Sequence, residues 1–179
     1  MTVDGLVKRY VIDTSAIGDL EGISPSTSYT SDKEERERIW GNLEDMIKAD
    51  RLVCVSAAKT EFERRCAHAY KRLRPLWSTF FRRDSIPLYA EVQNVLAQSS
   101  YWQRDAQRTK ANRDKADWYL VALARLEGRT VVTNEKHRRD RTPNNRNGDN
   151  IPDVCDRMGV RWKYFADLVR EENLDCPPS

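Results

Sequence analysis

Short apolar runs recur along this chain and end on polar residues. Tyr10-Val11-Ile12 leads directly into Asp13, and comparable runs occupy residues 52–55 and 130–133. A run without alternation of apolar and polar side chains is typical of a strand covered on both faces, as in parallel sheets. These runs, with a last strand at residues 160–164, predict a mostly parallel sheet, and Asp13 stands at the end of the first strand.

Helical periodicity fills most of the sequence between these runs. Helices are predicted at residues 31–49, 58–69, 116–126 and 167–174, with an irregular helical region at 75–97 that breaks near Pro87 and a short helix opening at 151–155. Ser31 and Glu34 are spaced as a capping box, and Gly128 suits the end of a helix. Residues 18–31 and 136–150 are interpreted as loops.

Strands that alternate with helices of this length predict an α/β fold. We expect a three-layer α/β/α sandwich around a central, mostly parallel sheet. The chain has 179 residues, which is the size of one domain, so we expect a single domain over residues 1–179.

Composition excludes several kinds of chemistry. The 31 Lys and Arg nearly balance the 28 Asp and Glu, so the net charge says little about partners. The glycines never form G-x-G, no G-x-S-x-G is present, and four cysteines without C-x-x-C spacing beside two histidines offer no zinc template. With no signal-peptide pattern and no apolar run near the roughly 18 residues of a membrane helix, we expect a cytoplasmic protein with reduced thiols. If the protein is an enzyme, carboxylates must do its chemistry.

Acidic residues stand where strands end and helices begin. They are Asp13, Glu61 or Glu63, Asp117, and Glu135 with Asp153. Aspartate is favoured at helix starts by capping and by the helix dipole, so a purely structural role stays open for Asp13, Asp117 and Asp153.

Asp117 stands out in its segment, whereas the pattern does not distinguish the two glutamates. Asp117 is the one charged residue in A-D-W-Y-L-V-A-L-A, and a partly buried carboxylate is costly unless it is paired or bound to a cation. Periodicity cannot separate Glu61 from Glu63, because both flank the apolar stripe at Phe62. Arg65 follows Glu61 at i+4, so a surface salt bridge is an alternative role for that glutamate.

The acidic segments together resemble PIN-domain ribonucleases. The matching stretches are Y-V-I-D-T-S-A at Asp13, T-E-F at Glu61, A-D-W-Y-L-V-A-L-A at Asp117 and V-V-T-N-E at Glu135, in the family's order. The closing I-P-D-V-C-D-R-M-G-V is similar to a segment of one bacterial and archaeal branch. The chain departs from the family at Glu135, where an aspartate is usual, and Asp153 could share or replace that role. The resemblance selects Glu61, with Glu63 in reserve.

The resemblance implies a divalent-metal-dependent endoribonuclease using Mg²⁺ or Mn²⁺. It implies Asp13, Glu61, Asp117 and Glu135 as catalytic residues and metal ligands, Asp153 as a further ligand, and Ser15, Thr133 and Asn134 as hydrogen-bond partners of metal-bound water or phosphate. Hard cations prefer such oxygen ligands and can activate water for attack on a phosphodiester. The resemblance also implies RNA as substrate, an antitoxin protein as partner and a homodimer.

Two basic stretches are candidates for contact with RNA phosphates. The run K-H-R-R-D-R-T-P-N-N-R-N, residues 136–147, directly follows Glu135, and the second set is Arg104, Arg108, Lys110, Arg113 and Lys115. A solvated charged surface is the alternative for both. Tyr101 and Trp102 could stack on bases, although a place in the core or at an interface is the commoner role.

Two rival functions stay open. The chain could be a PIN scaffold that binds RNA or a protein without cleavage, which the departure at Glu135 favours. It could also be a small-molecule phosphohydrolase on a similar frame, but D-T-S stands where such enzymes commonly carry D-x-D.

Overall fold

A five-stranded parallel sheet forms the centre of the molecule. The computed structural model describes residues 7–21, 30, 32–108, 116–145 and 148–177. The strands are β1 (Tyr10–Ile12), β2 (Leu52–Val55), β3 (Phe81–Arg82), β4 (Thr130–Val132) and β5 (Trp162–Lys163), in the order β3-β2-β1-β4-β5. Val11 pairs in parallel register with Val53 on one side and Val131 on the other. The predicted α/β class and parallel sheet are confirmed.

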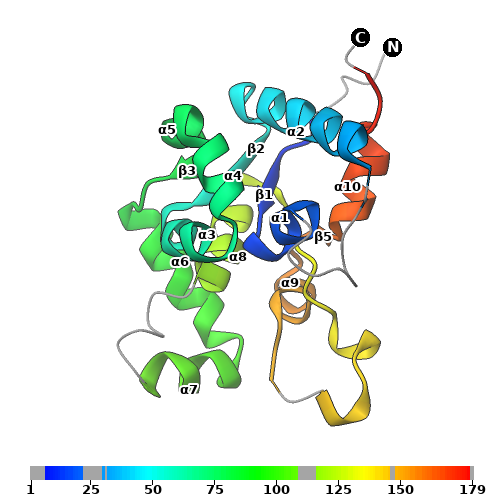
Figure 1. The fold of residues 1–179 in the computed structure, drawn as a ribbon. Coiled ribbons are helices and arrows are strands. Elements are labelled where there is room, and N and C mark those ends of the chain that lie inside the picture. The colour runs from blue at the N-terminus through cyan, green and yellow to red at the C-terminus, as the bar shows by residue number, and fades with distance from the viewer. Residues whose placement is uncertain (1–6, 22–29, 31, 109–115, 146–147, 178–179) are drawn as a thin grey trace, which may run out of the picture.

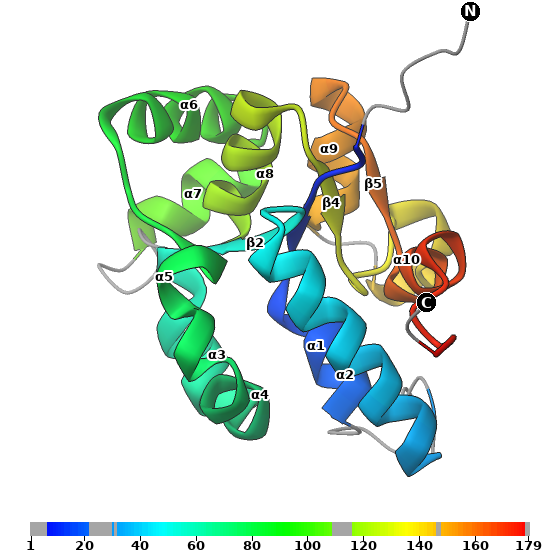
Figure 2. The same ribbon diagram turned by 90° about the horizontal axis from the view of Figure 1, so that it is seen from above.

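Helices cover both faces of this sheet. In chain order they are α1 (Thr14–Glu21), α2 (Lys33–Lys48), α3 (Lys59–Arg65), α4 (Ala67–Arg72), α5 (Trp77–Phe80), α6 (Ile86–Ala97), α7 (Ser100–Arg108), α8 (Ala116–Glu127), α9 (Ile151–Met158) and α10 (Phe165–Glu172). Figure 1 shows α2 and α10 on one side of the sheet and α6, α8 and α9 on the other, and Figure 2 shows the same layers from above. The sheet is therefore the middle of three layers.

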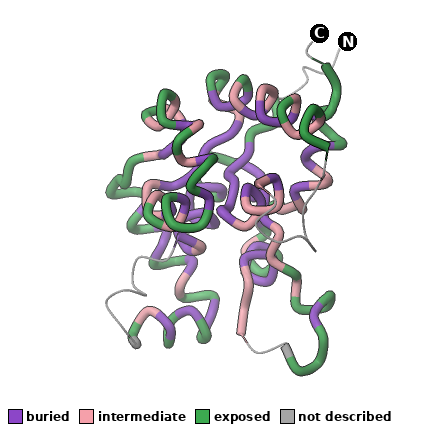
Figure 3. The backbone as a smooth tube through the Cα atoms, in the orientation of Figure 1, coloured by how far each residue is buried: buried purple, intermediate pink, exposed green. Residues whose placement is uncertain are grey.

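The core is continuous across these layers. All residues of β1, β2 and β4 are buried, as the purple trace at the centre of Figure 3 shows. Phe62 of α3 packs edge-to-face against Phe80 and Phe81, with ring centroids 5.6 and 5.7 Å away. The apolar segment of α8 is buried from Trp118 to Ala124, as its sequence predicted.

The structure corrects several predicted boundaries. Residues 18–21 belong to α1 and not to a loop, and β3 lies inside the region predicted as irregular helix. Asp32 caps α2 by accepting hydrogen bonds from the N–H groups of Glu34 and Glu35, whereas Ser31 lies outside the described residues. The apolar stripe through Phe62 is divided between α3 and α4, because the backbone leaves the helical region at Cys66.

None of the described helices combines the length and the apolar character that crossing a membrane requires.

Two glycines allow the effect of a positive φ at a helix end to be compared with that of a glycine inside a helix. Gly128 ends α8 with φ +64°, a conformation that disfavours L side chains, whereas Gly41 lies inside α2; neither has an atom within 4 Å of an added Cβ. We expect Gly128→Ala to lower the free energy of unfolding by about 1 kcal/mol. Gly41→Ala should raise it by up to about 1 kcal/mol, because alanine favours helix. Urea denaturation of both variants tests this, and shifts of the same sign would contradict it.

Candidate active site at the carboxyl edge of the sheet

The strand order reverses its direction at β1. The chain passes from β1 outward through β2 to β3 and then returns to β4 on the opposite side of β1. At such a reversal, the loops after neighbouring strands diverge and leave room for a ligand at the carboxyl ends. Asp13 follows β1, and Thr133, Asn134 and Glu135 follow β4, so the predicted residues of these two strands lie at one edge.

Asp13 is the buried centre of this edge. Its backbone N–H donates to the carbonyl of Val132 at 2.8 Å, which continues the ladder between β1 and β4. Its Oδ2 accepts hydrogen bonds from the Ser15 N–H at 3.3 Å, from the Ser15 hydroxyl and from the Thr133 hydroxyl at 3.1 Å. Ser15 and Thr133, predicted to contact water or phosphate, therefore hold the Asp13 carboxylate.

Asn134 connects the site to its supporting helices. Its N–H donates to the Ser15 hydroxyl at 3.0 Å, its Nδ2 donates to Asp19 of α1 at 2.5 Å, and its Oδ1 accepts from the Phe165 N–H of α10 at 3.0 Å. The carboxamide that was predicted to bind water or phosphate thus joins α1 to α10. Within the described chain, the buried hydroxyl of Thr14 has no hydrogen-bond partner.

The structure separates Glu61 from Glu63. The negative charge of Glu61 contributes to the raised pKa of both Asp13 and Glu135. Glu61 therefore belongs with these two acids, and together with Asp117 the four residues are called the acidic cluster. Glu63 is exposed, and its charge acts on Tyr70. The carboxylate of Glu61 also accepts a hydrogen bond from Arg65 at 2.8 Å, the salt bridge that its sequence spacing allowed.

Asp117 and Glu135 approach the cluster from α8 and from the end of β4. Asp117 lies in the first turn of α8 and is half-buried. Its charge is the strongest electrostatic influence on Glu135. The Oε2 of Glu135 accepts a hydrogen bond from the N–H of Ile151, the first residue of α9, at 2.9 Å. Arg113, Asp114 and Lys115, which the sequence placed near Asp117, lie outside the described residues.

Burial and mutual repulsion shift the protonation of these acids. Burial, followed by the charges of Asp117, Asp13 and Glu61, raises the pKa of Glu135 to about 8. The pKa of Asp13 is also raised, mainly by burial, and its hydrogen bonds from Ser15 and Thr133 oppose the shift. The four carboxyl groups therefore influence one another, as closely placed acids do.

Asp153 has a different environment. It is buried, and its oxygens accept from the N–H of Arg138 at 2.7 Å, from the N–H of Asn150 at 2.8 Å and from the guanidinium of Arg141 at 2.5 Å. Of the two acids that the sequence left open, Glu135 therefore joins the cluster, whereas Asp153 caps α9 and anchors the preceding loop. Arg141 belongs to the basic run that was predicted to contact RNA phosphates, but it is buried and paired with Asp153, a contact that the polar loop sequence did not indicate.

The basic run beside the site divides into exposed and buried members. Lys136, Arg138 and Arg139 are exposed just after Glu135, whereas Arg141 is buried on Asp153. Arg146 lies outside the described residues. These three exposed side chains, here called the basic flank, are the members available to a ligand.

The second basic stretch is described only in part. Arg104 is exposed, but Lys110, Arg113 and Lys115 lie outside the described residues, as does the side chain of Arg108. Trp102 is buried and donates to the carbonyl of Asp149 at 3.0 Å, so it belongs to the core. Tyr101 lies over Gly148, where an added Cβ would approach its ring to 2.7 Å.

The cluster offers the oxygen donors that Mg²⁺ or Mn²⁺ prefers. In the part of the chain that is described, however, no group of three or more His, Cys, Asp or Glu side chains is arranged to hold a metal ion. Instead, each of three acids accepts a hydrogen bond from the protein. Glu61 accepts from the Arg65 side chain, Glu135 from the Ile151 N–H and Asp13 from the Ser15 N–H. The chemistry of these carboxylate oxygens fits a divalent cation.

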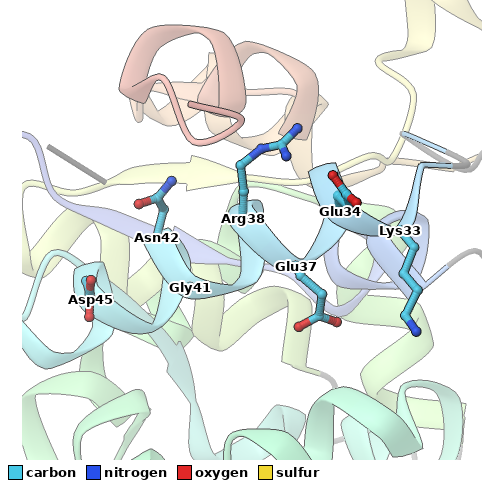
Figure 4. A pocket seen from close by; sticks show the side chains of 7 residues that line it. All are labelled: Lys33, Glu34, Glu37, Arg38, Gly41, Asn42 and Asp45. Atoms are coloured by element: carbon cyan, nitrogen blue, oxygen red, sulfur yellow. The ribbon is translucent and has the colours of Figure 1, made fainter. Parts of the chain in front are cut away.

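A separate hollow of about 630 Å³ lies on the outer face of α2 (Figure 4). Its lining contains Lys33, Arg38 and Asp45 around Gly41 and shares no residue with the carboxylate cluster.

The fold and this edge define an α/β protein with an acidic cluster at the switch point of a parallel sheet. Residues 10–176 match the family model described as a domain of unknown function, DUF4411, and the chain belongs to this family. No curated protein matches the chain.

The raised pKa of Glu135 predicts a pH-dependent stability. Folded Glu135 keeps its proton up to about pH 8, whereas the unfolded chain loses it near the ordinary value of 4.5. The folded state therefore binds more protons in this window, and stability should fall as pH rises from about 4.5 to 8. In EDTA, Glu135→Gln should reduce the decline of the melting temperature between about pH 4.5 and 8. Glu63→Gln should show the same decline as wild type. Parallel curves for wild type and Glu135→Gln would contradict this.

Neutralising two buried aspartates should change stability in opposite directions. Asp153→Asn leaves the Arg141 guanidinium buried without its counterion and should cost about 3 kcal/mol or more. Asp13→Asn removes a charge that burial disfavours and should raise stability near neutral pH. Denaturant unfolding in EDTA measures both values, and a large loss from Asp13→Asn would show that its carboxylate has a structural role.

Proposed function

We propose that this protein is a divalent-metal-dependent endoribonuclease that hydrolyses RNA phosphodiester bonds on a PIN-like fold. The observation that carries the proposal is the grouping of Asp13, Glu61, Asp117 and Glu135, from four separate segments, at one edge of the sheet, where burial first and the neighbouring acids second raise the pKa of Asp13 and Glu135. A fold gains no stability from gathering such charges. Acids with shifted pKa values at the switch point of a parallel sheet are a recurrent feature of functional sites.

Each acid has a distinct part in the proposed site. Asp13 and Asp117 would be the principal ligands of Mg²⁺ or Mn²⁺, with Glu61 at the side and Glu135 completing the set. The bound cation would supply an activated water and compensate charge at the phosphodiester. Ser15 and Thr133 fix the Asp13 carboxylate through Oδ2. Glu135 carries a proton near neutral pH, so cation binding there would release it.

The basic flank supports RNA as the substrate. Four acids repel a polyanion, so a nuclease needs cationic groups close to its carboxylates. Lys136, Arg138 and Arg139 are exposed within four residues of Glu135 along the chain. Phosphate contacts of this kind position the strand without reading its sequence.

The resemblance to PIN-domain toxins extends the proposal to partners. We include an antitoxin protein that would hold the nuclease inactive, and a second copy of this chain as a homodimer. Both partners rest on the sequence resemblance alone.

One observation favours a second function, a scaffold that binds RNA without cleaving it. Glu61 is paired with Arg65, and the described acids do not converge on one point as they lie. If the side chains cannot rotate together, the edge would retain RNA contacts through the basic flank and lack activity.

Thermal unfolding and RNA cleavage test the proposal with three proteins. We compare wild type, Asp13→Asn and the exposed control Asp45→Asn on α2, first in EDTA and then in millimolar Mn²⁺. A cation at 100 times its dissociation constant should stabilise wild type and the control by about 2.7 kcal/mol, which is a rise of several degrees. Both should cleave single-stranded RNA in Mn²⁺, and Asp13→Asn should show neither response. An equal metal shift in all three proteins, or no shift at all, would contradict the site. RNA binding without cleavage by wild type would establish the scaffold.

A further inference from the structure

A groove of about 620 Å³ lies between α6, α7 and α8, within the size range of ligand pockets. The three helices are grouped at one end of the molecule in both ribbon views (Figures 1 and 2). Three glutamines line it: Gln93 from α6, and Gln103 and Gln107 from α7. All three are exposed, so their carboxamides are available at the surface.

Among the described residues, those that line the groove carry no charge. A third of the residues in the chain are charged, yet the rest of the lining consists of leucine, alanine and Trp118. A phosphate or a carboxylate would find no cation among these described lining residues. Carboxamides offer donors and acceptors together, so the lining suits a neutral molecule with both kinds of group.

Trp118 provides a second, independent indication of a ligand. This side chain lines the groove and is fully buried, and its Nε1–H has no acceptor in the described part of the chain. An unsatisfied buried donor costs roughly 1–3 kcal/mol, so native proteins rarely retain one without a reason. An acceptor carried by a ligand, reached by a shift of the covering side chains, would satisfy it.

The groove and the acidic residues share the start of α8. Trp118, which lines the groove, directly follows Asp117 along the chain. A strand whose phosphodiester lies at Asp117 would therefore pass the entrance of the groove. The flanking nucleotide is the part of the substrate nearest to the three glutamines.

We propose that this groove is a nucleobase subsite that selects the RNA sequence beside the scissile bond. The inference rests on the proposed nuclease function and adds the element that reads the base. A carboxamide can donate and accept on one base edge, as glutamine does with N6 and N7 of adenine. Unpaired bases are commonly recognised in this way, splayed out of the strand and hydrogen-bonded in a pocket. An apolar helix of a protein partner would leave the three amides without partners.

The test combines cleavage preference with direct binding. Homopolymer RNAs of the four bases are cleaved in Mn²⁺ by wild type, by the double variant Gln103→Leu and Gln107→Leu, and by the control Gln98→Leu. Gln98 is exposed at the end of α6 and outside the groove lining. Separately, the five indole N–H signals are followed by NMR in EDTA as nucleoside monophosphates are added, with Trp118→Phe assigning one of them.

We expect the double variant to reduce the ratio of fastest to slowest cleavage about tenfold, and the control to keep it. The Trp118 signal should move with nucleotide in wild type. An unchanged ratio in the double variant, or a Trp118 signal that stays fixed at millimolar nucleotide, would overturn the subsite. A protein partner would then be the better occupant. A moving Trp118 signal together with no cleavage of any RNA would retain nucleotide binding in the groove while the nuclease proposal fails.

Discussion

Repulsion among the carboxylates at the end of β1 is the constraint on which the rest of this edge depends. Asp13 is buried directly after β1, a strand that pairs on both sides, and its own N–H continues the ladder to Val132. The surrounding chain compensates with hydrogen-bond donors: the Ser15 and Thr133 hydroxyls on Asp13, and the Ile151 amide on Glu135. These donors are neutral, so they hold the acids without supplying a counter-charge.

Asp153 shows how the same fold treats a structural acid. It is as buried as Asp13, but it is paired with Arg141 and accepts two backbone N–H groups. Asp153 has a cationic partner, whereas the Ser15 and Thr133 donors on Asp13 are neutral. We infer that Asp153 serves the stability of the fold and that Asp13 is held for chemistry. A carboxylate that only had to support the fold could have received an arginine, as Asp153 did.

The sequence predicted the features that depend on local pattern. Uninterrupted apolar runs located β1, β2 and β4, and the convergence of parallel carboxyl ends then placed Asp13 beside Glu135. Features that depend on distant contacts were not predictable. The two residues of β3 are too few to carry a period, and Phe81 gains its strand position by pairing with β2 and packing against Phe62. Periodicity could not choose between Glu61 and Glu63, because both flank one stripe; the family resemblance selected Glu61, the glutamate whose charge acts on Asp13 and Glu135.

The anchoring of the loop after β4 also determines where the basic flank lies. Asp153 holds the Arg138 N–H and the Arg141 side chain, so one buried acid fixes the path of the segment that carries the basic flank. The exposed cations are thereby kept within a few residues of Glu135 without pairing with the acidic cluster. A flexible loop would let its arginines neutralise Asp13 and Glu135 directly and close the site to a cation. With Arg141 paired to Asp153, the acidic residues and the basic flank remain neighbours, which is the charge arrangement that the proposed metal-dependent site for RNA would use.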